Sequence, residues 1–144
     1  MPVLLYILTK LLAYIGWMYV GLRVLRGRSQ ASAARAFFLG VLRLFLGLLF
    51  AVVIYLFSSA LLSHLGFGLA ANAVTYLSVY VPVRWLEWSL MAALVLSPSI
   101  SQFLLGTGKT DRLWRAGGIV ISCLADIPLI LSLGGVIPTG RFLC

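Results

Sequence analysis

Residues 82–89 read PVRWLEWS and place opposite charges inside a long apolar run. Arg84 and Glu87 are three residues apart, a spacing that puts two side chains on one helix face within reach of an ion pair. Trp85 and Trp88 share that spacing on the neighbouring stripe. Ionisable groups inside a bilayer mark functional sites, whereas an arginine flanked by tryptophans at a helix mouth is typical of an interfacial anchor. Both interpretations stay open at this stage.

The composition is that of an integral membrane protein. The 144 residues are 62% hydrophobic and 10% charged, whereas soluble domains carry about 45–50% apolar and about 25% charged residues. The net charge of +8 is mostly concentrated in two short loops between apolar runs, which is typical of membrane topology and not of nucleic-acid binding. We therefore expect an all-α polytopic protein of the bacterial cytoplasmic (inner) membrane, with no nucleic-acid partner.

Four apolar runs predict a bundle of four transmembrane helices that forms one domain, residues 1–144. A hydrocarbon core of about 30 Å needs about 20 helical residues. The predicted helices cover residues 3–22, 36–57, 83–103 and 116–137. The first run lacks the basic start and the cleavage site of a signal peptide, so we expect it to be retained.

A proline interrupts the longest apolar run. Residues 73–105 are almost continuously apolar, and a helix of that length would measure about 50 Å, too long for one straight crossing. Pro82 disfavours helix at the residue before it and lacks a backbone N–H. We therefore expect a break at Pro82, with residues 73–81, including Tyr76 and Tyr80, forming an interfacial or re-entrant segment before the third span.

Loop charge predicts the threading. The connections at residues 23–35 and 106–115 hold seven of the eleven Lys and Arg residues, and residues 58–72 hold none. The positive-inside rule places the two basic connections in the cytoplasm, so that both termini lie outside. A five-helix alternative with a cytoplasmic turn at residues 84–88 would put the second basic connection outside, and it is rejected for that reason.

Motif searching gives no catalytic or metal-binding site. The string GTGKT at residues 106–110 resembles a phosphate-binding loop, but the Walker pattern needs a glycine where this chain has Phe103. One histidine, His64, cannot supply the usual nitrogen ligands of a metal or haem site. The two cysteines have no paired spacing. We therefore expect no enzyme activity and no bound metal, and the sequence leaves any cofactor undefined.

Charged side chains fall inside the predicted spans: Lys10, Arg43, Arg84, Glu87 and Asp126. Helical rise places Lys10 about 12 Å, Asp126 about 16 Å, Arg43 about 20 Å and Glu87 about 6 Å below the outer edge. Lys10 can then meet Glu87 or Asp126, and Arg43 can reach Asp126 or extend to the cytoplasmic headgroups. A carboxylate at the depth of Asp126 pairs, takes up a proton or lines a water path, or it makes a packing hydrogen bond.

The segment PVRWLEWS resembles the third-helix motif of microbial rhodopsins, and especially of heliorhodopsins. In that motif an arginine is followed three residues later by the carboxylate counterion of the Schiff base and then by an aromatic residue. The resemblance covers eight of the 144 residues and implies that Glu87 is the counterion and Arg84 its partner. Those families have seven helices and a retinal-bearing lysine on the last one. Here the only lysine within a predicted span is Lys10, on the first.

These patterns predict a non-catalytic subunit or scaffold of a larger membrane complex, in contact with pigment, quinone or lipid. The charges inside the spans, the small residues of the helix faces and four tryptophans are more polar and packing surface than a lone bundle would satisfy. A second hypothesis is a small oligomeric proton or cation transporter or channel that uses Asp126 and Glu87. A third is a remnant rhodopsin-like bundle.

Overall fold

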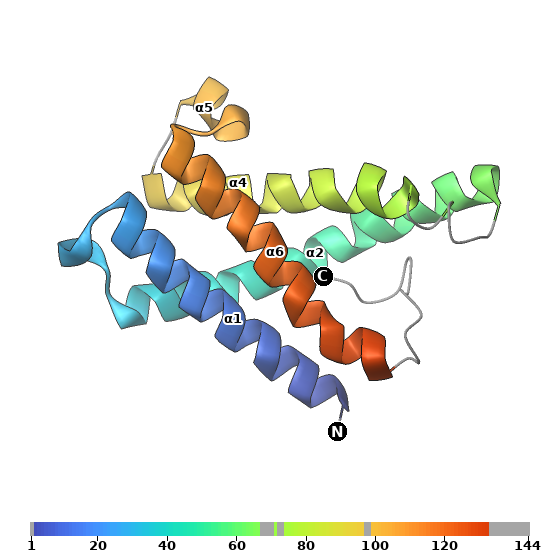
Figure 1. Cartoon of the computed structure of the whole chain (residues 1–144), viewed down its shortest axis with the longest axis horizontal. Coiled ribbons are helices and arrows are strands. Elements are labelled where there is room, and N and C mark those ends of the chain that lie inside the picture. Colours follow the sequence, from blue (N-terminus) through green and yellow to red (C-terminus); the bar gives the residue numbers. More distant parts are fainter. Residues whose placement is uncertain (1, 67–70, 72–73, 97–98, 133–144) are drawn as a thin grey trace.

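The computed structural model describes residues 2–66, 71, 74–96 and 99–132, and these are almost entirely helical (Figure 1). The elements in chain order are α1 (Pro2–Leu25), the 3₁₀ turn η1 (Arg28–Gln30), α2 (Ala33–Leu65), the π-helical stretch η2 (Tyr76–Tyr80), α4 (Val81–Leu96), α5 (Ile100–Leu105) and α6 (Lys109–Ser132). In this part of the chain, three helical stretches are long and apolar enough to cross a membrane: Leu4–Leu25, Ala33–Leu65 and Leu77–Leu96. The predicted all-helical fold is confirmed.

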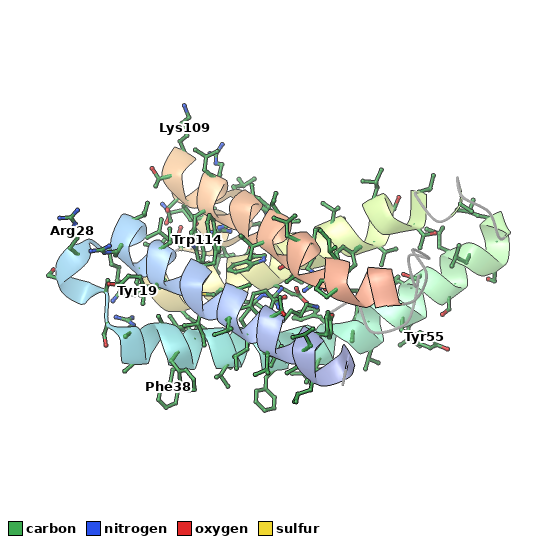
Figure 2. All side chains as sticks on the ribbon, turned by 60° about the horizontal axis from the view of Figure 1, so that its bottom comes forward. Tyr19, Arg28, Phe38, Tyr55, Lys109 and Trp114 are labelled. Carbon is green, nitrogen blue, oxygen red and sulfur yellow. The ribbon has the colours of Figure 1, made fainter. Side chains whose placement is uncertain are left out.

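Each long helix runs antiparallel to its main neighbours. Gly40 of α2 lies against the backbone of Ile15, which lets α1 and α2 approach closely after the turn at Gly27 (φ 89°). Helix α6 lies against α1 and α4, and the far half of α2 and η2 project past them (Figure 1). The connection after α1 and the start of α6 therefore lie at the same end of the bundle, as Arg28 and Lys109 show in Figure 2.

Helix α2 is longer than predicted. It continues through residues 58–65, which the sequence analysis placed in a loop, and it ends at Gly66 (φ 77°). Ala60, Leu61, Leu62 and Leu65 in this stretch favour a helix, and Gly66 ends it with a positive φ that glycine adopts without strain. Its 33 residues span about 50 Å, so the helix tilts or extends beyond a core of about 30 Å.

Pro82 changes the helix type without ending the helix. The stretch η2 leads directly into α4, and the apolar span begins at Leu77. A proline removes the N–H that the carbonyl of Ser78 would accept in an α-helix, and its ring crowds that carbonyl. The π-helical stretch Tyr76–Tyr80 lies in the turn before the proline, where this α-helical hydrogen bond is missing. The described part of residues 73–81 is therefore continuous with the third long helix.

The third helix ends earlier than predicted. Helix α4 is described as far as Leu96, and residues 99–103, which we expected in the same span, belong to the separate short helix α5 and its cap. Ser99 and Gln102 form a capping box that starts α5. A new N-terminal cap within the apolar run gives the chain a second helix start where hydropathy alone shows none.

Helices α1 and α6 lock together through two tryptophans and two glycines. Trp17 Nε1 donates to the Trp114 carbonyl at 3.0 Å, and Trp114 Nε1 donates to the Trp17 carbonyl at 3.2 Å. The ring of Trp114 covers Gly21, and the ring of Trp17 covers Gly117. Each tryptophan thus fills the space above the other helix's glycine and satisfies its own N–H there.

Candidate functional site: a buried charge network

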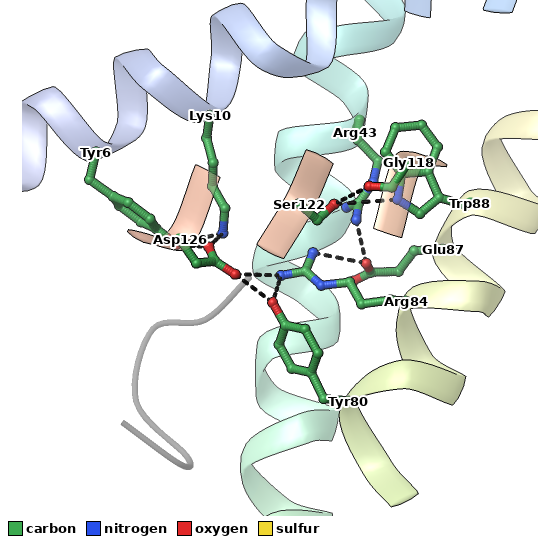
Figure 3. A network of polar contacts seen from close by, with 10 residues as sticks. All are labelled: Tyr6, Lys10, Arg43, Tyr80, Arg84, Glu87, Trp88, Gly118, Ser122 and Asp126. Atoms are coloured by element: carbon green, nitrogen blue, oxygen red, sulfur yellow. Dashed lines mark hydrogen bonds and ion pairs between the residues drawn. The ribbon is translucent and has the colours of Figure 1, made fainter. Parts of the chain in front are cut away.

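The five charged side chains of the predicted spans meet in the middle of the bundle (Figure 3). They come from all four long helices and are at most 2% exposed: Lys10 on α1, Arg43 on α2, Arg84 and Glu87 on α4, and Asp126 on α6. Such groups remain stable in a poorly hydrated interior only when they are paired and hydrogen-bonded. We call this set the buried charge network.

Asp126 holds one half of the buried charge network. Lys10 Nζ lies 2.7 Å from Asp126 Oδ1, and Arg84 Nη2 lies 3.9 Å from Oδ2. Two phenols complete the site, since Tyr6 donates to Oδ1 at 3.0 Å and Tyr80 donates to Oδ2 at 2.6 Å. Each carboxylate oxygen therefore has one cation and one hydroxyl donor.

The two arms that reach Asp126 have the same construction. On α1, Lys10 lies four residues after Tyr6, donates to its hydroxyl at 2.5 Å and lies 4.7 Å from its ring centroid. On α4, Arg84 lies four residues after Tyr80, donates to its hydroxyl at 2.6 Å and also lies 4.7 Å from the ring. The spacing of four places each tyrosine and its cation on one helix face.

Glu87 holds the other half. Its Oε2 accepts from Arg43 Nη2 at 2.5 Å and from Arg84 Nη1 at 3.1 Å. Among the described residues, Glu87 Oε1 and the Nε and Nη1 of Arg43 have no hydrogen-bond partner. The Glu87 half therefore contains one carboxylate oxygen and two guanidinium nitrogens that make no hydrogen bond to a described residue.

Aromatic rings enclose the guanidinium of Arg43. Its Cζ lies 4.9 Å from the Tyr14 ring centroid and 5.1 Å from the Trp88 ring. Trp88 is fully buried, covers Gly118 and donates to Ser122 at 3.3 Å. The buried charge network has three cations and two carboxylates, and the two ring faces stabilise the surplus cation without a further carboxylate.

The structure decides the pairings that the sequence left open. Lys10 meets Asp126 and not Glu87. Arg43 meets Glu87, so both pairings expected for it, with Asp126 or with the cytoplasmic headgroups, are wrong. The reason is depth, because a span that begins at Leu77 puts Glu87 about 15 Å along the helix, and not the 6 Å expected from a start after Pro82.

The expected pair of Arg84 and Glu87 is present, but it is fully buried and is no anchor at a helix mouth. Trp88 and Tyr80 are also buried, so their prediction as interfacial aromatics is wrong. Trp85 is half-buried and donates to the Leu104 carbonyl at 2.9 Å. The side chain of Tyr76 lies outside the described part of the structure.

A second buried ion pair was missed by the sequence analysis. Arg115 Nε donates to Asp111 Oδ1, and Arg115 Nη2 donates to Asp111 Oδ2, both at 2.8 Å. Arg115 Nη1 also donates to Ser89 at 2.8 Å and to the Phe103 carbonyl at 2.5 Å, which holds the end of α5 against α4 and α6. The acid four residues before the arginine was a readable sign of this pair.

Thr107 completes the surroundings of Asp111. Its backbone N–H and its hydroxyl donate to Asp111 Oδ2 at 2.8 and 3.2 Å. Burial alone would raise the pKa of the Asp111 carboxyl, but the hydrogen bonds from Arg115 and Thr107 outweigh burial and lower that pKa below its ordinary value. Asp111 is thus an ionised carboxylate that fixes the turn between α5 and α6.

Comparisons of the chain with protein-family models, with curated proteins and with solved structures give no match. The chemistry of the site must therefore be argued from its own residues. Within the described ranges, no three His, Cys, Asp or Glu side chains lie close enough together to hold a metal ion. The buried charge network joins four helices. At Glu87, the oxygen Oε1 can also accept a hydrogen bond from a further polar group.

Proposed function

We propose that α6 is the fourth transmembrane helix and that both termini lie outside the cytoplasm of a bacterial cell. Its 24 residues span about 36 Å, which is enough for one crossing. It runs antiparallel to α1 and α4, so the two basic connections share one end of the bundle. That end is cytoplasmic by the positive-inside rule, in the inner membrane.

Cysteine labelling tests this threading. Ser29 and Ser63 are exposed and lie near opposite ends of α2. Ser29→Cys should react with an impermeant thiol reagent only from the cytoplasmic side, and Ser63→Cys only from outside. Cys123→Ser and Cys144→Ser provide a background without native thiols. The reverse pattern would overturn the proposed orientation.

We propose further that the protein is a non-catalytic subunit or scaffold of a larger membrane complex, in contact with pigment, quinone or lipid. The observation that supports this is the set of close partners of Asp126, whose two oxygens contact Lys10, Tyr6 and Tyr80. A carboxylate held this way joins helices and is less open to a transported ion or a reacting group than one without such partners.

Purification in a mild detergent, with native mass and an absorption spectrum, tests this function. We expect a heteromeric complex that contains one or more further membrane proteins. A lone homo-oligomer with no other chain would contradict the subunit proposal. The spectrum also tests the resemblance to rhodopsins: a visible band that shifts to longer wavelength in Glu87→Gln would support a bound retinal. We expect no such band, because Lys10 is engaged with Asp126.

A second candidate function is proton or cation transport through Asp126 and Glu87, and one observation favours Glu87 as the residue that carries it. Glu87 Oε1 is the one oxygen of the two network carboxylates without a hydrogen-bond partner in the described residues. Flux into liposomes tests this candidate. If the protein transports, Glu87→Gln should abolish flux even in the variant protein that reconstitutes folded, although the loss of the carboxylate beside two buried arginines should also lower its melting temperature. Equal flux in wild type, in Glu87→Gln and in empty liposomes would exclude it.

A further inference from the structure

All of the chain's negative side chains are used inside the bundle. The sequence has three acidic residues, and all three are buried in ion pairs: Glu87 with Arg43 and Arg84, Asp126 with Lys10, and Asp111 with Arg115. The surface therefore carries no carboxylate side chain that could balance an exposed cation.

Several cations of the described residues lie outside these pairs at one end of the bundle. Arg23, Lys109, Arg112 and Arg28 are exposed and Arg35 is half-buried. The antiparallel packing of α1 and α6 brings the connection after α1 to the start of α6, with Arg28 and Lys109 at the same end (Figure 2). We call this set of five residues the cationic end. No side chain within the chain can neutralise it, so its counter-charge must come from another molecule.

Apolar side chains stand beside these cations. On α5, Ile100 is 93% exposed and Leu105 is 70% exposed, and Leu113 on α6 is 62% exposed between Arg112 and the buried Trp114. Exposed leucines and isoleucines next to Lys and Arg suit the boundary between lipid headgroups and acyl chains. An acidic protein partner would match the charges alone, whereas a lipid surface matches both the charges and the apolar residues.

We propose that the cationic end binds anionic phospholipids, with the phosphate headgroups on its Arg and Lys side chains and the acyl chains against α5. The proposal does not depend on whether the protein is a subunit or a transporter. It requires only that the long helices span a bilayer, which places their ends at headgroup level. Basic residues at that level attract anionic lipids over a distance of about one Debye length.

Thermal unfolding with added lipid tests the proposal. The purified protein in an uncharged detergent is mixed with phosphatidylglycerol or with phosphatidylcholine of the same acyl chains. We expect phosphatidylglycerol to raise the thermal midpoint by several degrees more than phosphatidylcholine, and the difference to shrink at high salt. Native mass spectrometry should show phosphatidylglycerol retained on the protein in preference to phosphatidylcholine.

Two matched variants locate the effect. Arg28→Gln, Lys109→Gln and Arg112→Gln together remove three exposed charges, and this variant should lose most of the preference for phosphatidylglycerol. Arg28→Lys, Lys109→Arg and Arg112→Lys together keep the charges and should retain the preference. Both variants should unfold at the wild-type temperature in phosphatidylcholine, because none of the three side chains is buried.

Three results would overturn the proposal. The first is equal stabilisation by the two lipids. The second is a preference for phosphatidylglycerol that survives in the glutamine variant. The third is an equal rise in midpoint with inorganic phosphate alone at matched ionic strength, because the anion would then come from solution. Copurification of an acidic protein that is lost in the glutamine variant, with no lipid preference, would assign the cationic end to that protein.

Discussion

The two halves of the buried charge network differ in how completely their carboxylates are satisfied. At Asp126, each oxygen has a cation and a phenol, supplied by two arms of the same construction from α1 and α4. At Glu87, one oxygen takes both arginines and the other has no partner among the described residues. Figure 3 shows both halves joined through Arg84.

The difference follows from which residues surround each carboxylate. Tyrosines four residues before Lys10 and Arg84 supply hydroxyls that bridge each cation to Asp126. Near Glu87, Tyr14 and Trp88 instead cover the faces of Arg43 with their rings. A ring face stabilises a cation but accepts no N–H hydrogen bond of ordinary strength. We therefore call Asp126 the closed joint, because both of its carboxylate oxygens have partners, and Glu87 the open joint, because its Oε1 has no hydrogen-bond partner among the described residues.

The largest expected effect is at the closed joint. Asp126→Leu leaves Lys10 buried without its carboxylate, so we expect a loss of about 3–5 kcal/mol in unfolding free energy, the usual cost of breaking a buried ion pair. An SDS titration in mixed micelles measures this. Adding Lys10→Met should recover part of the loss. If the two losses simply add, the ion pair does not stabilise the bundle, and the two halves do not differ in the proposed way.

Removal of single hydroxyls compares the halves directly. Tyr80→Phe removes a hydroxyl that donates to Asp126 and accepts from Arg84, so we expect a loss of about 1.5–3 kcal/mol. Tyr14→Phe is the matched control, because the Tyr14 hydroxyl has no partner among the described residues. The control should be neutral or slightly stabilising. Equal losses in the same SDS titration would show that the Glu87 half is as well satisfied as the Asp126 half.

The packing of Trp88, which covers Arg43 beside Glu87, can be tested at the neighbouring Gly118. A Cβ at Gly118 would meet the ring of Trp88, which covers Arg43. We expect Gly118→Ala to lower the unfolding free energy by about 1–3 kcal/mol, the usual cost of overpacking. Gly16→Ala is the control, since a Cβ there meets nothing within 4 Å. An unchanged melting temperature in Gly118→Ala would show that Trp88 moves freely.

The smallest effect is expected at Asp111, in the first turn of α6, at the end of the bundle. Its pKa is lower in the folded protein than its ordinary value of 3.8. The ion pair therefore stabilises the fold above about pH 4, and this contribution is lost as the pH falls through the folded pKa. The melting temperature of Asp111→Asn should lie below that of wild type at pH 7. The gap should narrow below pH 4, and a constant gap down to pH 3 would contradict this.

The depth of Glu87 within its span is the part of the prediction from sequence that is wrong. The five residues of the buried charge network were all predicted to lie inside the spans, because charge inside an apolar run is visible in one dimension. The sequence predicts a third span that starts after Pro82, whereas the helix begins before this residue. That error placed Glu87 near the outer edge and hid its pairing with Arg43. A proline removes one backbone N–H, but neighbouring turns can adapt to this loss, so a proline does not always end a helix.

Composition and hydropathy by themselves predicted an all-helical fold with helices long and apolar enough to cross a membrane, because hydropathy is a local property of the chain. The four-residue separation of Asp111 and Arg115, which places them on one helix face, is also a local property of the chain. Only the tertiary structure decided that Tyr6, Tyr80 and Lys10 meet at Asp126, and that Glu87 keeps an open oxygen. These contacts join residues from different helices, and they depend on helix rotation and depth, which packing between helices sets.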